Sequence, residues 1–162
     1  MNGRGGVESE LDLGVGWQDP AVIRESGLCV WRSGETPVLD FKQSGDFLRG
    51  RMAILWSGAP HDTPGVVDRG RDYDRIAQAA RQARQAVMNS DLEGLAQAVA
   101  LSYQVQQGEG MNELPEVAGA LARKYSGGGH GGYGLYLFSD EGSRDRAVSE
   151  DDRFRAIEPY IR

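Results

Sequence analysis

A tract dense in glycine interrupts the last third of the sequence. Six of the chain's 23 glycines fall within positions 127–134, in the run Ser-Gly-Gly-Gly-His-Gly-Gly that begins at Ser126. Glycine weakens both helices and strands, and because it has no Cβ it leaves backbone N–H groups open to close approach. The tract therefore predicts a loop that separates two regular elements and can contact a phosphate or another stretch of backbone.

The tract matches neither of the two common phosphate-binding motifs. A Walker loop requires Gly-Lys-Ser/Thr at the start of a helix, and a dinucleotide-binding loop follows a strand and precedes a helix. Here the predicted order is the reverse: a helix at about 114–124, with Pro115 in its first turn, and then the apolar strand 134–138. Taken alone, the tract is also explained by a flexible connector.

The first half of the chain alternates short extended segments with turns. The β-rich runs 28–32 and 37–42 are separated by Ser33-Gly34-Glu35, a pattern typical of a hairpin. The continuous apolar run 52–56 predicts a strand covered on both faces.

The middle third has helical periodicity. A first helix is predicted over 75–88, and a second one is predicted to begin at Ser90, because Glu93 completes a capping box, and to end at Gly108. The residues predicted to face inward are Ile76, Ala80, Ala83 and Val87 in the first helix, Leu92, Leu95, Ala96, Val99 and Tyr103 in the second, and Leu114, Val117, Ala118, Leu121 and Ala122 in the helix at 114–124.

Two further elements follow the tract's strand. Residues 143–149 can form a short helix, and 154–161 read as a strand at a sheet edge, because Pro159 cannot donate to a central ladder. This order of strands and helices predicts an α+β fold, a sandwich in which helices cover one face of a mainly antiparallel sheet.

Composition excludes several classes of function. The 162 residues carry a net charge of −6 without a basic block, which argues against nonspecific nucleic-acid binding. No apolar run reaches the roughly 18 to 20 residues of a membrane span, and no signal-peptide pattern opens the chain, so a cytoplasmic protein is expected. The single Cys29 and two histidines predict no disulfide framework and no metal site.

Three segments together resemble the GHMP small-molecule kinases. Residues 122–138, which contain the glycine tract and its strand, resemble the third conserved motif of that superfamily. Gly-Val-Gly-Trp-Gln-Asp at 14–19 looks like the Gly-Gly-Trp-Gln-Asp-Gln segment of the fucokinase and D-glycero-D-manno-heptose 7-phosphate kinase branch, and 55–63 is similar to its strand with a substrate-side loop. The resemblance implies the C-terminal portion of a sugar kinase, with a ferredoxin-like domain.

The resemblance also implies site residues. These kinases transfer the γ-phosphoryl group of ATP to a sugar hydroxyl, and the matching position makes Asp19 the catalytic base. The same Asp before Pro20 also suits a helix N-cap or a turn. By resemblance, the substrate-binding residues are Trp17, Gln18, Ser57, Gly58, His61 and Thr63, and the phosphate loop consists of Ser126, Gly127, Gly128, Gly129, His130, Gly131 and Gly132.

Some positions depart from the family pattern. His130 stands where the family usually has Gly, so its side chain could crowd the phosphate path, donate to a phosphate, or be a solvent-exposed bystander. Pro20 replaces a Gln, and the basic residue expected in 57–63 is absent. No segment resembles the Gly-Leu-Gly-Ser-Ser loop that binds ATP and Mg²⁺ in the N-terminal half of these kinases. ATP and Mg²⁺ are therefore expected only in the complete kinase, and this chain alone is expected to bind neither.

The resemblance sets the expected organisation and partners. Residues 1–13 form a disordered leader or residual helix, 14–50 the Asp-bearing segment and hairpin, and 51–162 the kinase C-terminal-like domain. Besides a sugar or sugar-phosphate substrate, we expect either a separately encoded N-terminal half or self-association; the alternative function is a noncatalytic sugar-binding or regulatory module. The candidate apolar residues for such an interface are Trp17, Val22, Ile23, Leu28 and Trp31, and the alternative is that they are buried in the core of this chain.

Overall fold

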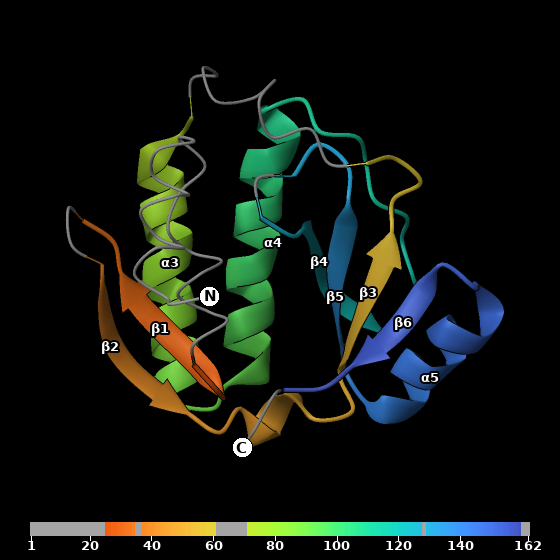
Figure 1. Cartoon of the computed structure of the whole chain (residues 1–162), viewed down its shortest axis with the longest axis horizontal. Helices are drawn as coiled ribbons and strands as arrows, with labels where there is room; N and C mark the ends of the chain where they lie inside the picture. Colours follow the sequence, from red (N-terminus) through yellow and green to blue (C-terminus); the bar gives the residue numbers. More distant parts are fainter. Residues whose placement is uncertain (1–24, 35–36, 61–70, 128, 160–162) are drawn as a thin grey trace, which may run out of the picture. The chain divides into compact units, whose positions relative to one another are not determined.

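The computed structural model describes residues 25–34, 37–60, 71–127 and 129–159 (Figure 1). Its chain divides into two compact units, of which the second is Asp46–Glu158. In the first unit, β1 (Leu28–Arg32) and β2 (Val38–Gln43) pair antiparallel, with an irregularity between Val30 and Trp31. This is the hairpin that the sequence predicts.

The second unit is built on a four-stranded sheet. Its strands are β3 (Met52–Trp56), β4 (Ala120–Tyr125), β5 (Tyr133–Phe138) and β6 (Phe154–Ile157), in the order β4-β5-β3-β6. All neighbouring strands are antiparallel. β3 lies inside the sheet, which explains its apolar run, and β6 is an edge strand as predicted.

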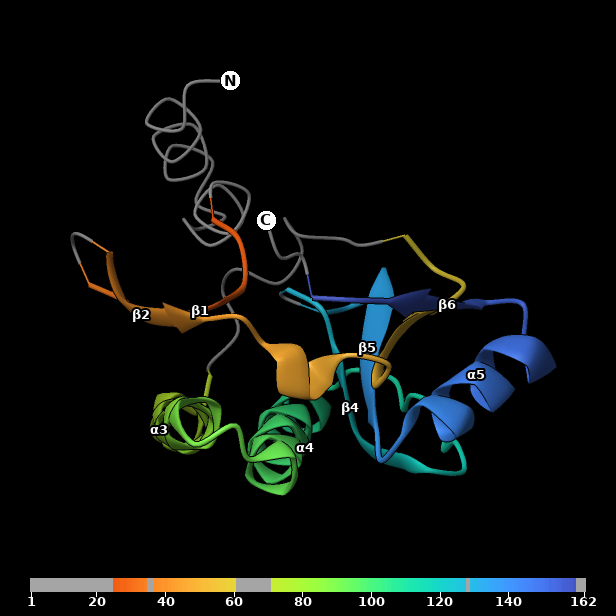
Figure 2. The ribbon, with the colours of Figure 1, turned by 90° about the horizontal axis from the view of Figure 1, so that it is seen from below.

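In the part of this unit that the structure describes, three α-helices accompany the sheet: α3 (Tyr73–Met88), α4 (Leu92–Gly108) and α5 (Glu141–Glu150). α4 and α5 lie on the same side of the sheet, and α3 lies beside α4 (Figures 1 and 2). With a short 3-10 helix at Asp46–Leu48 before β3, the element order and strand order give the predicted α+β, ferredoxin-like sandwich. No helix in the described ranges combines the length and apolar character needed to cross a membrane.

An aspartate caps each helix. Asp72, Asp91 and Asp140 accept hydrogen bonds from the backbone N–H groups of the third residue after each of them, at 3.0, 3.0 and 2.8 Å. The predicted cap at Ser90 is therefore wrong by one residue. Ser90 has a φ of 52°, in the left-handed region, so it turns the chain from α3 into α4 rather than capping the new helix.

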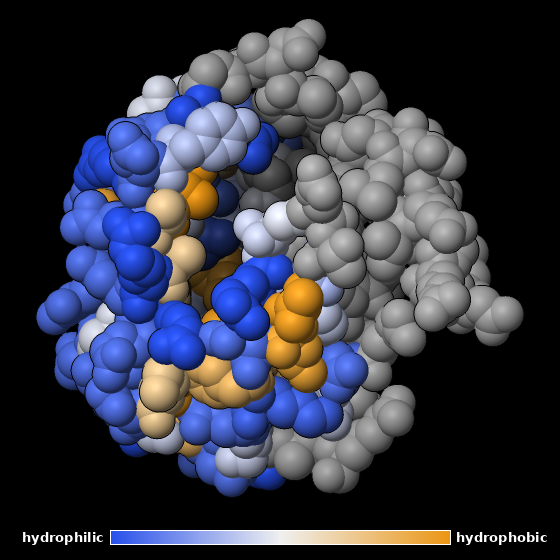
Figure 3. Space-filling model, turned by 90° about the vertical axis from the view of Figure 1, so that its left-hand side faces the viewer, coloured by the Kyte–Doolittle hydropathy of each residue, from blue (hydrophilic) through white to orange (hydrophobic). Residues whose placement is uncertain are grey.

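The buried face of α3 also differs from the prediction. Ala79, Ala86 and Val87 are buried, whereas Ile76 is 37% exposed and Ala80 is exposed. Because α3 packs mainly against α4 among the described elements, a narrow strip of small side chains is enough for the contact. Among the described residues on the face seen in Figure 3, most are hydrophilic, and a smaller apolar area lies near the centre of the view.

The helix predicted at 114–124 is absent, because this stretch contains an irregular segment followed by β4. Tertiary contacts override its helical spacing: Tyr103 Oη accepts the N–H of Leu114 at 2.6 Å, and Tyr136 Oη donates to the carbonyl of Pro115 at 2.9 Å. Gly119, in the middle of the predicted helix, has a φ of +80°, and a Cβ there would lie 2.5 Å from Ser143. The chain must therefore turn at this glycine.

The core lies between the sheet and the helices α4 and α5. Tyr136, Phe138 and Phe154 are at most 2% exposed, and the ring of Tyr136 meets that of Phe154 edge-on at 5.0 Å. Tyr103 from α4 and Ala147 from α5 belong to the same buried cluster. One face of the sheet is thus closed by helices.

Candidate functional site

The segment that follows β3 is hydrogen-bonded to the glycine loop. Ser57 N–H donates to the carbonyl of Gly132 at 2.9 Å, and Gly132 N–H donates to the carbonyl of Ala59 at 2.8 Å. A Cβ at Gly131 would lie 2.3 Å from the carbonyl oxygen of Pro60, so only glycine permits this approach. We call Ser57–Pro60 together with Gly129–Gly132 the loop junction. It brings together two segments that the sequence predicted to share a site.

The glycine loop connects two antiparallel strands, β4 and β5, and not a helix and a strand. Ser126 N–H donates to the carbonyl of Tyr133 at 2.8 Å and closes the loop, and the φ angles of residues 129–132 are all between +56° and +100°. Four successive left-handed residues explain the density of glycine. A Cβ at Gly129 would also lie 2.2 Å from Met111 Sδ.

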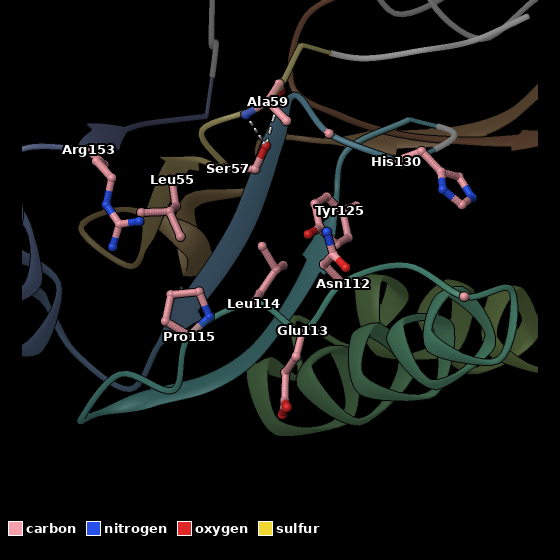
Figure 4. A pocket seen from close by; sticks show the side chains of 12 residues that line it. Leu55, Ser57, Ala59, Asn112, Glu113, Leu114, Pro115, Tyr125, His130 and Arg153 are labelled. Atoms are coloured by element: carbon pink, nitrogen blue, oxygen red, sulfur yellow. Dashed lines mark hydrogen bonds between the residues drawn. The ribbon is translucent and has the colours of Figure 1, made fainter. Parts of the chain in front are cut away.

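His130 is the exception within this run. Its φ of 56° is uncommon for a residue with a Cβ, although His adopts this region more readily than most side chains do. The residue is half-buried and lines a pocket, with its imidazole at one side of the opening (Figure 4). The structure thus places His130 at a pocket wall, and its role stays a prediction.

The pocket lies on the helix side of the sheet and has a volume of about 440 Å³. Leu55, Leu114 and Tyr125 contribute apolar surface, and Figure 4 shows Ser57 and Ala59 at one end. Its polar side chains come from Ser57, Asn112, Glu113, His130 and Arg153. Of the predicted site residues that are described, Ser57, His130 and Gly131 line this pocket, whereas Gly58, Ser126, Gly127, Gly129 and Gly132 do not.

Sequence reasoning missed Arg153, Asn112 and Glu113. Arg153 reaches the pocket because Trp56 N–H donates to its carbonyl at 3.1 Å, where the start of β6 meets the end of β3. Its guanidinium binds Asp151, with Nη2 at 2.6 Å from Oδ2, and holds the pKa of Asp151 below the ordinary range. No local sequence signal marks this pairing, since it depends on the strand order.

Gln106 fixes the pocket wall formed by Tyr125. The buried side-chain amide of Gln106 donates to the carbonyl of Tyr125 at 3.1 Å and accepts its N–H at 2.9 Å. Through Gln106, α4 thereby satisfies the N–H and carbonyl groups of Tyr125 on the edge strand β4. Without Gln106, these backbone groups would be open to water or to another chain. Burial raises the pKa of the Tyr125 phenol, so this wall is uncharged at neutral pH.

Several predicted residues lie outside the described ranges. They are Trp17, Gln18, Asp19, His61, Thr63 and Gly128. The catalytic role of Asp19 and the substrate-binding roles of its neighbours therefore stay predictions.

The glycine loop supplies backbone N–H groups of the kind that bind anions. No group of three or more His, Cys, Asp or Glu side chains in the described ranges is arranged to hold a metal. In the glycine loop, the N–H groups of Gly129 and Gly132 already donate within the protein. Those of Gly127, His130 and Gly131 donate to no described residue, which leaves up to three donors for an anion.

The chain was compared with known proteins. No family model matches it, and no curated protein matches its sequence. A D-glycero-D-manno-heptose 1-phosphate kinase from Bacteriodes thetaiotaomicron matches with a TM-score of 0.59 at 18% identity, over 93% of this chain and 50% of that one. L. major mevalonate kinase, solved with R-mevalonate, matches with a TM-score of 0.56 at 22% identity, over 75% and 43%.

A Listeria innocua protein matches with a TM-score of 0.52 at 18% identity, over 67% of this chain and 38% of that one. The chain thus spans at most half the length of these matched structures. At such identities the likeness concerns the fold. The chain shares its α+β fold with part of each of these structures, two of which are kinases.

Proposed function

We propose that the chain is the C-terminal portion of an ATP-dependent GHMP-type kinase that phosphorylates a hydroxyl of a sugar or sugar phosphate. The loop junction is the observation that carries this proposal. Two segments that are distant in the sequence, each similar to a different kinase motif, are joined where β3 ends and β5 begins by hydrogen bonds between residues 73 and 75 positions apart. The shared fold with two kinases supports the same conclusion.

The junction suits phosphoryl transfer because that reaction depends on positioning and on stabilising phosphate charge. The N–H groups of His130 and Gly131 are donors that need no side-chain rearrangement. Their loop is fixed on one side by the Ser126–Tyr133 hydrogen bond and on the other by Ser57 and Ala59. Such a preorganised backbone can hold phosphate oxygens in place.

The remaining parts of the proposed kinase come from the sequence resemblance. Asp19 would act as the base for the acceptor hydroxyl, and Trp17, Gln18, His61 and Thr63 would contact the acceptor. ATP and Mg²⁺ would be held mainly by a further segment or by a separately encoded N-terminal half. For this chain alone we expect no measurable heat on titration with Mg·ATP, and micromolar binding would assign the nucleotide clamp to this chain.

The phosphate role of the junction is tested with inorganic tripolyphosphate, added to the ¹⁵N-labelled chain. We expect concentration-dependent amide shifts at His130–Gly132 and Ser57–Ala59. Gly131→Ala should abolish them, because its Cβ cannot fit against Pro60, while Gly108→Ala, whose Cβ enters open space, should keep them. If Gly131→Ala is poorly folded, Gly129→Ala provides the second test, because its Cβ would lie 2.2 Å from Met111 Sδ and must displace the same loop, which should weaken the response.

An absence of shifts at the junction, or shifts that both loop variants leave unchanged, would overturn the phosphate role.

The proposed catalytic base, Asp19, is tested once the complementary N-terminal half of the kinase is present. Asp19→Asn should abolish turnover with little change in acceptor affinity, and Asp12→Asn, the control at a carboxylate seven positions earlier in the sequence, should retain turnover. Retained turnover in Asp19→Asn would remove Asp19 from the role, and acceptor binding with no phosphoryl transfer would indicate a noncatalytic sugar-binding module.

A further inference from the structure

Two aromatic side chains form a corner on the sheet face opposite the core. Trp56 on β3 and Tyr133 on β5 are direct cross-strand partners, with ring centroids 5.1 Å apart and planes tilted by 58°. Their neighbours Leu55 and Gly134 are buried toward the helices, so alternation along the strands turns both rings to the other face. Tyr133 is 45% exposed and Trp56 is half-buried, which leaves ring surface accessible.

This aromatic corner, Trp56 and Tyr133, is continuous with the loop junction. Trp56 precedes Ser57, Tyr133 follows Gly132, and the hydrogen bond from Ser57 N–H to the Gly132 carbonyl is the next rung after the aromatic pair. A molecule that rests on the rings can therefore extend to the backbone donors of the glycine loop. Gly58 has open space where a Cβ would stand, so no side chain at that position obstructs the approach.

Lys124 supplies a positive charge on the same face. It is the cross-strand partner of Leu135, which lies two residues from Tyr133. A diagonal pair of this kind is separated by about 7 to 8 Å, within reach of a lysine side chain. Burial alone lowers the pKa of the Lys124 amine, and no carboxylate of the described residues pairs with it. A bound anion would supply the missing partner and favour the charged amine.

The opposite edge of this face offers a contrast. Arg155 on β6 is the cross-strand partner of Ile54, which in turn pairs with Leu135, so Arg155 and Lys124 stand at the two ends of one row. The guanidinium of Arg155 already donates to the carbonyls of Asp152 and Phe154. Neither cation has a carboxylate partner among the described residues, but the Lys124 amine, unlike the guanidinium of Arg155, donates to no described residue and so can donate to a ligand.

We propose that Trp56, Tyr133 and Lys124 form an acceptor subsite for a sugar phosphate in its ring form. The flat C–H face of the sugar ring packs on the aromatic corner, and the phosphate that the acceptor already carries pairs with Lys124. The ring hydroxyls at the junction side then face the glycine loop. This inference rests on the proposed kinase function and narrows its acceptor to cyclic, anionic sugars.

A purely structural role for the aromatic corner makes a different prediction. Cross-strand aromatic pairs stabilise sheets by themselves, so a loss of stability on substitution does not distinguish the two roles. Discrimination between a cyclic and an open-chain ligand does distinguish the binding role from the structural one. D-mannose 6-phosphate and D-mannitol 1-phosphate carry the same phosphate and almost the same atoms, but only the former closes into a ring.

The test compares the two probes by amide-shift titration of the whole chain. We expect D-mannose 6-phosphate to bind about 3- to 10-fold more tightly than D-mannitol 1-phosphate, the range of one aromatic contact. Trp56→Ala should remove that preference, and Lys124→Ala should weaken both probes by about tenfold. Tyr73→Ala, an aromatic that is 71% exposed on α3, and Arg155→Ala, a cation at the other sheet edge, should change neither affinity.

Equal affinities for the two probes, no binding of either, or an equal loss in Arg155→Ala and Lys124→Ala would each overturn the subsite. If Trp56→Ala does not fold, Tyr133→Ser at the exposed ring tests the same preference. Failure of the sugar subsite can be distinguished from failure of the proposed phosphate-binding role of the loop junction. A junction that still responds to tripolyphosphate while the sugar probes fail refutes only the subsite, and an unresponsive junction refutes the phosphate role.

Discussion

The two faces of the β4-β5-β3-β6 sheet use aromatic residues in opposite ways. On the helix side, Tyr136 and Phe138 are 0% exposed and Phe154 is 2% exposed. On the other side, Tyr133 is 45% exposed although it belongs to the same strand as Tyr136 and Phe138. Leu137, on the same face as Tyr133, is 2% exposed, so that face is buried at the Leu137 end of β5 and accessible at the Tyr133 end, where a ring can contact a ligand.

The largest effect is expected from a core truncation. Phe138→Ala removes a fully buried ring and should lower the free energy of unfolding by about 3 to 5 kcal/mol. Trp56→Ala on the other face should cost no more than about 1 kcal/mol, the scale of a cross-strand pair. Urea unfolding of both variants measures the difference, and comparable losses would contradict the division between the faces.

The glycine loop allows a second comparison, between Gly129, where neighbouring atoms leave no room for a Cβ, and Gly127, where a Cβ would enter open space. Gly129→Ala adds a Cβ 2.2 Å from Met111 Sδ in addition to the strain of a left-handed φ, and should cost about 2 to 3 kcal/mol. Gly127→Ala has a left-handed φ with open space around the Cβ and should cost about 1 kcal/mol. Equal unfolding midpoints would show that the loop relaxes freely around Gly129.

The hydroxyl groups of Tyr136 and Tyr133, both on β5, allow the two faces of the sheet to be compared by removing a single atom from each side chain. Tyr136 donates to the carbonyl of Pro115, and burial raises the pKa of its phenol, so the hydroxyl is uncharged and structural. Tyr136→Phe leaves that carbonyl without its donor and should cost about 1 to 2 kcal/mol. Tyr133→Phe should leave the unfolding midpoint unchanged within about 0.5 kcal/mol. A larger loss in Tyr133→Phe would show that its hydroxyl serves the fold.

Local patterns predicted most elements, and tertiary contacts decided the rest. The hairpin, the inner strand β3 and the edge strand β6 follow from apolar runs and turn residues, which act locally. The segment 111–119 was wrongly predicted because its spacing is helical, while Tyr103, Tyr136 and the turn at Gly119 fix it otherwise. The sheet order, and with it the place of Arg153 in the pocket, depends on pairings that no local pattern encodes.

The same limit applies to the candidate site. Similarity to kinase motifs predicted that the Ser57 segment and the glycine loop act together, and their hydrogen bonds confirm that they are neighbours. The aromatic corner could not be predicted in the same way. Trp56 and Tyr133 are 77 positions apart in the sequence, and only the β3–β5 register makes them partners.

The smallest expected effect concerns a carboxylate at the end of the sheet. Glu158 accepts hydrogen bonds from Arg144 Nη1 at 2.8 Å and from Gly50 N–H at 2.9 Å, and these bonds lower its pKa. A lowered carboxyl pKa stabilises the folded state above the unfolded pKa of about 4.3, and the stabilisation is lost as the pH falls through the folded value. Because the side chain of Glu158 is 46% exposed, solvent screening should limit the contribution to less than about 1 kcal/mol.

Glu158→Gln isolates this contribution, since the amide can still accept from Gly50 but no longer carries the charge that Arg144 binds. We expect the variant to unfold at a slightly lower urea concentration than the parent at pH 7, and the difference to shrink as the pH falls below about 4.3 and Glu158 of the parent becomes protonated. Glu150→Gln, which removes an exposed carboxylate with no ion pair among the described residues, serves as the control for a general loss of charge. A difference between Glu158→Gln and the parent that stays constant from pH 7 to pH 3 would show that packing, and not the ionised carboxylate, is responsible.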